Sequence, residues 1–377
     1  MSRACACVAI YSILILLLFP YLCPSSQDQD QLDDGENDVY VRGIRAREAG
    51  DYDRAIALFS EAIRFNPGEP AGYNNRGVAY LNKGDLDKAI ADLNKAIHLD
   101  PRMAEGYCNR GLAFNKKGNL DMALIDIKKA LEIDRRLPLA YCCRASIYLE
   151  NGEYEKAIAD WNKALDLEPS SASAHVDRAI VYMHLAKYKE AMADVEQALR
   201  LDPKSWRGYE ARACIFNNKD DYAKALADFS QAIRIAPRLA KLYAARGDVY
   251  QNMGRPKSSL TDYTQALQLD PKMFHVYSRR ALVYQAQGEF DKAIEDCNCV
   301  IRLSPHLAEG YGCRGFCYLS MRDYKEAISD LTEAIRLDPK EASAYENRAS
   351  AYRGIHEEEK AAEDERKAEE LSKENGR

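Results

Sequence analysis

The sequence predicts an all-α solenoid built from ten tandem helix-turn-helix repeats. The first observation is a fixed period of 34 residues that links Gly50, Gly84, Gly118, Gly152, Gly254 and Gly288. The same ladder passes through Ala186, Asp220, Arg322 and His356, so ten copies follow one another without an insertion or deletion. We call these ten positions the turn markers. The second observation is an arginine eight residues before every turn marker. A fixed period in this range is typical of repeat architectures and decides the fold class.

Within the second copy, the pattern indicates one helix at about 71–83 and another at about 86–99. Gly84 tolerates the left-handed backbone angles that end a helix, and Asp85 is a good N-cap for the next one. Pro101 closes the unit because proline does not continue a helix interior. We therefore expect a first helix (helix A), a tight turn and a second helix (helix B) in each repeat.

Small residues mark the places where these helices should meet. Gly77, Ala89 and Ala96 leave room for close approach, and Tyr73 and Tyr80 fill the space around them at helical spacing. One hairpin cannot cover its own apolar face, so the stability must come from stacking of neighbours. A large side chain at Ala89 should overpack the contact, at a cost of about 1–3 kcal/mol.

These positions resemble the tetratricopeptide repeat. The aromatic, small and proline positions of that family are filled in the second copy by Tyr73, Gly77, Tyr80, Ala89, Leu93, Ala96 and Pro101. The resemblance runs from about residue 36 to the C-terminus and implies a right-handed superhelix whose helices A line a concave groove. Arginine stands before the small residue, where the family often has leucine, and this departure indicates a subtype.

The repeat phase predicts three parts in the chain. Residues 1–25 are expected to be a signal peptide or membrane anchor, and residues 26–35 an acidic flexible linker. The ten repeats are then expected at 36–69, 70–103, 104–137, 138–171, 172–205, 206–239, 240–273, 274–307, 308–341 and 342–375.

The N-terminal segment has the pattern of an export signal. Arg3 precedes an apolar run from Val8 to Phe19, and the small residues Cys23 and Ser25 precede a polar stretch. The uncharged run is also about long enough to cross a bilayer, so an uncleaved anchor stays open. Either alternative predicts an exported protein, secreted or periplasmic, or a membrane-anchored one with its repeats outside the cytoplasm.

Aspartate stands eight residues after nine of the ten turn markers, and Leu58 is the exception. We expect these aspartates to pair with the constant arginines, because an unpaired charge beside close-packed Gly or Ala would be costly. The alternative is a row of arginines that binds anionic ligands. The sequence leaves open whether each pair forms within a repeat or between repeats.

No pattern in the chain indicates catalysis or a cofactor. The six histidines fall in different phases of the repeat, and no phosphate loop, nucleophile elbow or HExxH motif occurs. The net charge of -6 argues against nucleic acid, which favours a clustered basic face. We therefore expect no enzyme, no cofactor and no metal, and a membrane contact only through the N-terminal segment.

Eleven cysteines occur, and Cys297, Cys299, Cys313 and Cys317 form the most notable group. Helix B of the eighth repeat should face helix A of the ninth, which would bring Cys297 towards Cys313 or Cys317. Buried free thiols are the favoured interpretation, and a disulfide is the second. Zinc is disfavoured, because residues two apart on a helix point in nearly opposite directions.

If helix A lines the groove, its polar and variable positions are the candidate binding residues. In the second and third repeats these are Asn74, Asn75, Asn109 and Asn115, and in the sixth to eighth repeats Arg207, Asn218, Lys241 and Arg279. Asparagine both donates to and accepts from a peptide backbone, which suits capture of an extended peptide. The sequence thus predicts a non-enzymatic scaffold for a protein or peptide partner. The alternatives are a membrane-anchored assembly factor or chaperone for envelope complexes, and the regulatory arm of a separate enzyme such as a glycosyltransferase.

Overall fold

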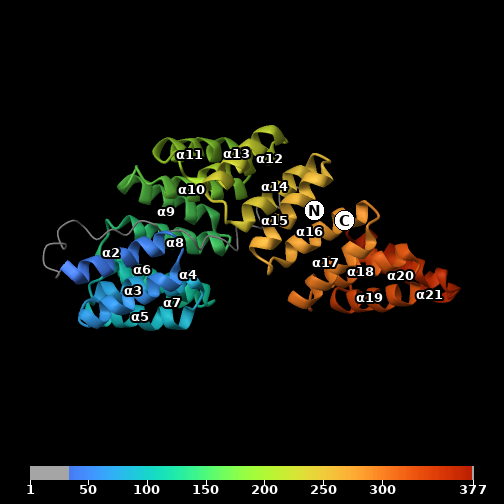
Figure 1. The fold of residues 1–377 in the computed structure, drawn as a ribbon, viewed down its shortest axis with the longest axis horizontal. Helices are drawn as coiled ribbons and strands as arrows, with labels where there is room; N and C mark the ends of the chain where they lie inside the picture. The colour runs from blue at the N-terminus through green and yellow to red at the C-terminus, as the bar shows by residue number, and fades with distance from the viewer. Residues whose placement is uncertain (1–33, 376–377) are drawn as a thin grey trace. The chain divides into compact units, whose positions relative to one another are not determined.

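The computed structural model describes residues 34–375 (Figure 1). Within this range the chain forms twenty α-helices and no strand. The predicted export segment and nearly all of the predicted linker lie outside the described residues. Among the helices that are described, none combines the length and apolar character needed to cross a bilayer.

The helices fall into two compact units, which meet in sequence between Asn218 and Lys219. Unit 1 contains α2 (Asp34–Glu48), α3 (Tyr52–Phe65), α4 (Pro70–Lys83), α5 (Leu86–Leu99), α6 (Ala104–Lys116), α7 (Leu120–Ile133), α8 (Pro138–Glu150), α9 (Tyr154–Leu167), α10 (Ala172–His184), α11 (Tyr188–Leu201) and α12 (Trp206–Asn218). Unit 2 contains α13 (Tyr222–Ile235), α14 (Ala240–Asn252), α15 (Pro256–Leu269), α16 (Phe274–Ala286), α17 (Phe290–Leu303), α18 (Ala308–Met321), α19 (Tyr324–Leu337), α20 (Ala342–Gly354) and α21 (Glu358–Asn375).

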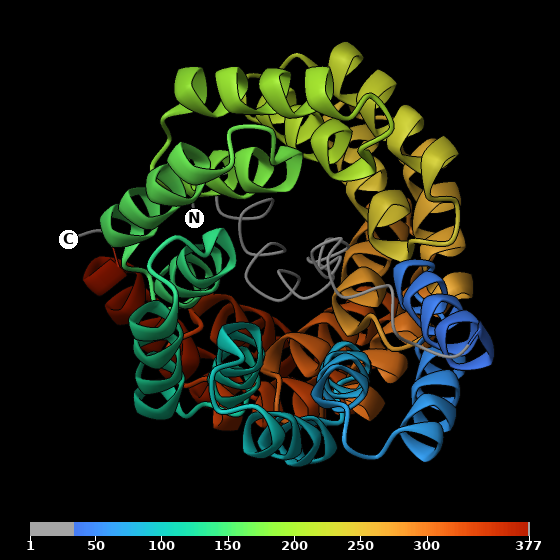
Figure 2. The same ribbon diagram turned by 90° about the vertical axis from the view of Figure 1, so that its left-hand side faces the viewer.

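Successive helices pack in pairs within each unit. In unit 1, α4 packs on α5 and α6 on α7, and the second helix of each pair contacts the first helix of the next (Figure 2). In unit 2, α14 packs on α15 and α18 on α19 in the same manner. The helices expected at 71–83 and 86–99 are α4 and α5, and both sets of bounds agree to within one residue. The predicted all-α solenoid of helix-turn-helix repeats is therefore confirmed.

Every turn marker adopts a left-handed backbone angle. The φ values range from 55° at Ala186 to 89° at Gly84, and the four markers that are not glycine share this conformation. The amide of Asp85, directly after the marker, donates to the carbonyl of Tyr80 at 3.0 Å, as in a Schellman motif. The Asp85 carboxylate then accepts from the amide of Lys88 and caps α5. The turn geometry is thus set by hydrogen bonding, which holds even where glycine is absent.

The core is a chain of small clusters between neighbouring helices. One of them joins Leu81, Ala89 and Leu93 of the second repeat with Ala113 of the third. A Cβ atom at Gly77 would lie 2.8 Å from Cγ of Leu93, so only glycine allows the observed approach. Such clusters explain why each repeat depends on its neighbours for stability.

The C-terminal helix α21 is the longest of the described helices and runs from Glu358 to Asn375. Its composition remains helix-forming throughout, and no glycine or proline interrupts it before Asn375. Glu365 stands at the position that is aromatic or aliphatic in most repeats, and it pairs with Arg353 of α20.

Candidate functional site

Bidentate arginine–aspartate pairs recur along each unit, and each of these pairs lies in a different repeat. In α14 and α15, Nε and Nη2 of Arg246 each donate to one carboxylate oxygen of Asp262, both at 2.8 Å. The same two bonds join Arg76–Asp92, Arg110–Asp126, Arg144–Asp160 and Arg178–Asp194 in unit 1, and Arg280–Asp296, Arg314–Asp330 and Arg348–Asp364 in unit 2. We call these eight pairs the arginine seam. The predicted ladder is confirmed, and each pair forms within one repeat.

The same guanidinium groups also bind the preceding repeat, which the sequence did not predict. Nη1 of Arg246 donates to the hydroxyl of Ser230 on α13 at 3.0 Å. The matching acceptors for other seam arginines are Ser60, Asn94, Asn162, Thr264, Asn298 and Thr332. The sequence feature that could have predicted these bonds is a hydroxyl or amide residue ten positions after the turn marker. Lys128 occupies this position before Arg144, and two cationic donors cannot share a hydrogen bond.

A tyrosine covers most seam arginines. The ring of Tyr243 lies 5.9 Å from the guanidinium carbon of Arg246, and its hydroxyl donates to the carbonyl of Pro237 at 3.2 Å. This contact is a cation–π interaction, and the hydroxyl bond fixes the link between successive repeats. With Nε, Nη1 and Nη2 all engaged, the guanidinium has little capacity left for an anionic ligand. The geometry therefore favours a structural role for the arginine row.

The electrostatic balance of the seam differs between repeats. Burial opposes ionisation of Asp194, but hydrogen bonds from Arg178 and His175 outweigh it and lower the pKa of this carboxyl. At Asp296 burial dominates over the bonds from Arg280 and raises the pKa. The second donor on Asp194 is Nδ1 of His175, at 3.0 Å. The bond from His175 thus adds to those from Arg178 at Asp194, whereas at Asp296 the charge of Glu295 adds to the effect of burial.

In unit 1, three of the predicted groove residues are buried. Asn74, Asn75 and Asn109 are at most 6% exposed. Nδ2 of Asn109 donates to Oδ1 of Asn74 at 3.0 Å, which links the third repeat to the second. Asn75 accepts from Arg47 at 2.7 Å and donates to the carbonyl of Ala71 at 3.0 Å. These amides are bonded within the protein.

The remaining predicted residues are half-buried and make contacts inside the chain. Asn115 donates to Glu150, and Arg207 pairs with Asp177. Asn218 donates to the carbonyl of Cys214 at 3.0 Å, and Lys241 is half-buried on α14. The assignment of all eight residues to a binding site stays a prediction.

Arg279, the last of the eight, belongs to a buried polar cluster in unit 2. It pairs with the carboxylate of Asp248, which also accepts from the hydroxyl of Tyr263 at 2.7 Å. Tyr263 is 1% exposed and replaces the apolar residue found at this position in most repeats. Burial, followed by the charge of Asp248, raises the pKa of Tyr263. Arg279, which was predicted to line the groove, therefore balances the charge of Asp248, and Asp248 accepts the hydrogen bond of the buried Tyr263 hydroxyl.

Sequence analysis missed an exposed apolar surface on helices A of unit 2. Leu282 of α16 is 53% exposed and Phe316 of α18 is 38% exposed, and they hold the same repeat position on helices that contact each other. Ala286 lies one turn after Leu282 and is also exposed. We call these three residues the apolar patch. The spacing of 34 residues was visible in the sequence, but apolar residues at this position in other repeats are buried or half-buried.

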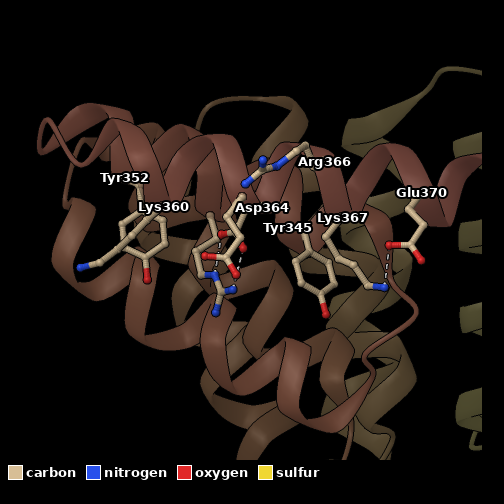
Figure 3. A pocket seen from close by; sticks show the side chains of 9 residues that line it. Tyr345, Tyr352, Lys360, Asp364, Arg366, Lys367 and Glu370 are labelled. Carbon is tan, nitrogen blue, oxygen red and sulfur yellow. Dashed lines mark hydrogen bonds and ion pairs between the residues drawn. The ribbon is translucent and has the colours of Figure 1, made fainter.

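A crevice of about 520 Å³ lies between α20 and α21 (Figure 3). Asp364 lies between the rings of Tyr345 and Tyr352, and Arg348, which bonds it, contacts both rings. Lys367 bonds Glu370 at 2.9 Å. Elsewhere in unit 2, Arg280 contacts two tyrosine rings in the same way. The contact of one guanidinium with two tyrosine rings is therefore a feature of more than one repeat. In the part of the chain that the structure describes, no group of His, Cys, Asp and Glu side chains could hold a metal ion.

The comparisons with known proteins agree with this architecture. Models described as tetratricopeptide repeat or TPR repeat match residues 40–104, 104–137, 127–159, 145–186, 172–205, 207–239, 240–273, 275–307 and 308–341. Together they span most of the chain, which belongs to the tetratricopeptide repeat family. Arrays of this family are protein-interaction scaffolds and are typically not catalytic, so this chain is a scaffold by class.

Three solved structures are similar to this chain. The Cut9 and Hcn1 hetero-tetramer of the APC/C is 16% identical, with a TM-score of 0.51 over 89% of this chain and 87% of that chain. Yeast Tom70 is 19% identical, with a TM-score of 0.43 over 90% of this chain and 85% of its own. YrrB, described as having an unusual peptide-binding site, is 21% identical, with a TM-score of 0.42 over 49% of this chain and 95% of its own. No curated protein matches the sequence significantly.

Proposed function

We propose that the array binds an extended segment of a partner protein on the helix-A surface of unit 2, with the apolar patch as its anchor. The observation that carries the proposal is the exposure of Leu282 and Phe316 at one repeat position of two contacting helices. Exposed apolar side chains that lie together mark interaction surfaces, whereas single ones need no explanation. Peptide capture by an aligned helix surface also requires no catalytic group.

The spacing of the helices defines the ligand. Packed helix axes lie about 8–10 Å apart, and an extended peptide in the polyproline II conformation advances about 3.1 Å per residue with three residues per turn, so residues three apart share a face. A segment that crosses α16 and α18 therefore places successive anchors about three residues apart. We propose a ligand with two large apolar side chains separated by two residues, one over Leu282 and one over Phe316.

The surroundings favour a ligand with little net charge. Arg279, one turn before Leu282 on α16, is paired with Asp248, and Ser320 lies one turn after Phe316 and is exposed. A charged ligand would have to compete for paired groups, while a polar peptide backbone can bond to hydroxyls. The predicted residues Lys241 and Arg279 then flank the ligand and contribute little to its affinity.

Peptide display against the purified full chain tests this proposal. The selected peptides should share two apolar residues with two residues between them. Fluorescence anisotropy with such a peptide should show at least a tenfold loss of affinity for Phe316→Ser and for Leu282→Ser. Ile125→Ser is the matched control, because Ile125 is 58% exposed but lies on α7 in unit 1. Selected peptides without the apolar pair, or equal binding by Phe316→Ser, would refute the proposal.

We also propose that the scaffold works outside the cytoplasm, either released or held by its N-terminal segment. The support is the sequence of residues 1–25, in which an apolar run follows Arg3 and precedes small residues. N-terminal sequencing of the protein isolated from cell fractions tests both forms. A start near Ser26 indicates cleavage, and a start at Met1 in the membrane fraction indicates an anchor. An intact N-terminus in the cytoplasmic fraction would overturn the proposal.

A further inference from the structure

Three cysteines from neighbouring repeats meet within unit 2. Cys297 lies on α17, and Cys313 and Cys317 lie one turn apart on α18. The Sγ atoms of Cys297 and Cys313 are 2.8 Å apart. Nε2 of Gln285, on α16, lies 3.2 Å from Sγ of Cys313 and 3.1 Å from Sγ of Cys317. The three sulfur atoms therefore form one cluster that a side-chain amide also contacts.

The repeat pattern explains why these sulfurs converge. Cys297 occupies the position that holds Leu93 in the second repeat and Phe229 in the sixth, so its side chain points into the contact between helices. Helices α17 and α18 pack against each other. Cys313 and Cys317 face the same point because residues four apart share a helix face.

We propose that Cys297 and Cys313 form a reversible disulfide that links the eighth repeat to the ninth. A disulfide bond is about 2.05 Å long, so the two sulfurs need to approach by less than about 1 Å. Cys297 and Cys317 are fully buried, while Cys313 is partly exposed. A reagent from solution therefore reaches Cys313 first, and Cys297 is the nearest thiol to complete the bond.

A low-molecular-weight disulfide is the oxidant in this step. The thiolate of Cys313 attacks one sulfur of the reagent, forms a mixed disulfide and releases one reagent thiolate. Cys297 then loses its proton to solvent, attacks Sγ of Cys313 and releases the second thiolate. Two protein thiols are oxidised, one reagent disulfide is reduced to two thiols, and the reaction is reversed by excess thiol.

Cys317 and Gln285 complete the cluster without joining the final bond. Hydrogen bonds from Cys297 and Cys313 lower the pKa of Cys317, whereas hydrogen bonds with Cys313 and Cys317 raise the pKa of Cys297. Cys317 is fully buried, so a reagent from solution reaches Cys313 before it reaches Cys317. The cross-link does not depend on the proposed peptide ligand.

Peptide mapping of the full chain tests the assignment. The protein is equilibrated with oxidised glutathione, free thiols are alkylated, and the chain is digested with trypsin without reduction. Cleavage after Lys292, Arg302, Arg314 and Arg322 separates Cys297, Cys313 and Cys317 into three peptides. The expected product is peptide 293–302 joined to peptide 303–314, and excess reduced glutathione should abolish it.

Cys299→Ser is the matched control, because Cys299 shares a tryptic peptide with Cys297 but contacts Arg302 on the helix surface. This variant should keep the joined product, and Cys313→Ser, at a partly exposed position, should lose it. Two findings would overturn the proposal. One is recovery of Cys297 and Cys313 as free thiols while Cys299 carries glutathione, and the other is a wild-type link through Cys299 or Cys317.

Discussion

The arginine seam keeps the same bonds from repeat to repeat, whereas the exposure of the helix-A surface changes between repeats. Both features use residues of helices A. On α16, Arg280 makes the same bonds as the other seam arginines, while Leu282, two residues later, is far more exposed than its equivalents. Val78 holds that position in the second repeat and is 6% exposed, whereas Leu282 is 53% exposed. The seam decides how repeats stack, and the helix-A surface is the proposed binding surface.

This difference has a physical origin. A guanidinium has a fixed geometry, so its bonds to Asp and to the preceding helix accept only one arrangement of the two repeats. A position on the helix-A surface carries no such requirement, and its exposure follows from the residues of the neighbouring repeat. Changes at the seam should therefore affect stability alone, and changes on the surface should affect binding alone.

The largest effect is expected for Asp262→Ala, which removes both acceptors of Arg246. The two side chains are 20% and 5% exposed, and removal of one partner from a buried pair costs about 3–5 kcal/mol. Because the Arg246 side chain remains partly solvated, we expect Asp262→Ala to lower the free energy of unfolding by about 3 kcal/mol. Hydrogen exchange of α14 and α15 should report the loss, since a repeat array opens locally.

The matched control for this change is Asp53→Ala. Asp53 pairs with Lys83 at the surface, and their side chains are 79% and 48% exposed, so the cost should stay below about 1 kcal/mol. Similar costs at the two sites would show that the seam contributes no more than a surface pair. A double-mutant cycle with Arg246→Met measures the coupling directly.

A smaller effect is expected for Ala89→Leu, where the repeats approach closely. Ala89 is fully buried between α4 and α6, and overpacking of such a site costs about 1–3 kcal/mol. Urea unfolding followed by circular dichroism measures the change. Ala91→Leu on the exposed face of α5 is the control and should be nearly neutral. An unchanged free energy of unfolding for Ala89→Leu would mean that the helices around Ala89 can move apart to admit the larger side chain.

The pH dependence should separate two members of the seam. The pKa of Asp194 is lowered, so its stabilisation is present above the unfolded pKa of about 3.9 and is lost as the pH falls through the folded pKa. The pKa of Asp296 is raised, so its ionisation costs stability as the pH rises from about 3.9 through the folded pKa.

Unfolding free energies of Asp194→Asn and Asp296→Asn, measured from pH 3 to 7 against wild type, should therefore change in opposite directions. The deficit of Asp194→Asn should grow as the pH rises, and the relative stability of Asp296→Asn should improve. Parallel slopes for the two variants would show that His175 does not distinguish the two carboxylates.

The smallest effect on stability is expected at the apolar patch. Leu282→Ser and Phe316→Ser should change the free energy of unfolding by no more than about 0.5 kcal/mol, because both residues are exposed. Val283→Ser is the control, since Val283 is 1% exposed and its loss from the core should cost about 2 kcal/mol. Equal costs for Leu282→Ser and Val283→Ser would place Leu282 in the core.

Most of the fold could be read from the sequence. The period located the helices and the turns, and the structure added that Ala186, Asp220, Arg322 and His356 share the left-handed angle of the glycine markers. The pairing of the constant arginines with aspartates followed from their fixed phase. These features are local or repeat-wide, so composition and spacing are sufficient to define them.

The partners and the exposure of the candidate site residues could be learned only from the tertiary structure. Only the packing of repeats showed that Asn74 and Asn109 bond to each other, that Arg279 balances Asp248, and that Leu282 is exposed. Each of these outcomes rests on a neighbour about one repeat away in the sequence, and the angle between two repeats decides which atoms meet. The sequence by itself therefore determined what each repeat is. The stacking of the repeats decided which polar side chains bond inside the protein and which apolar ones face solvent.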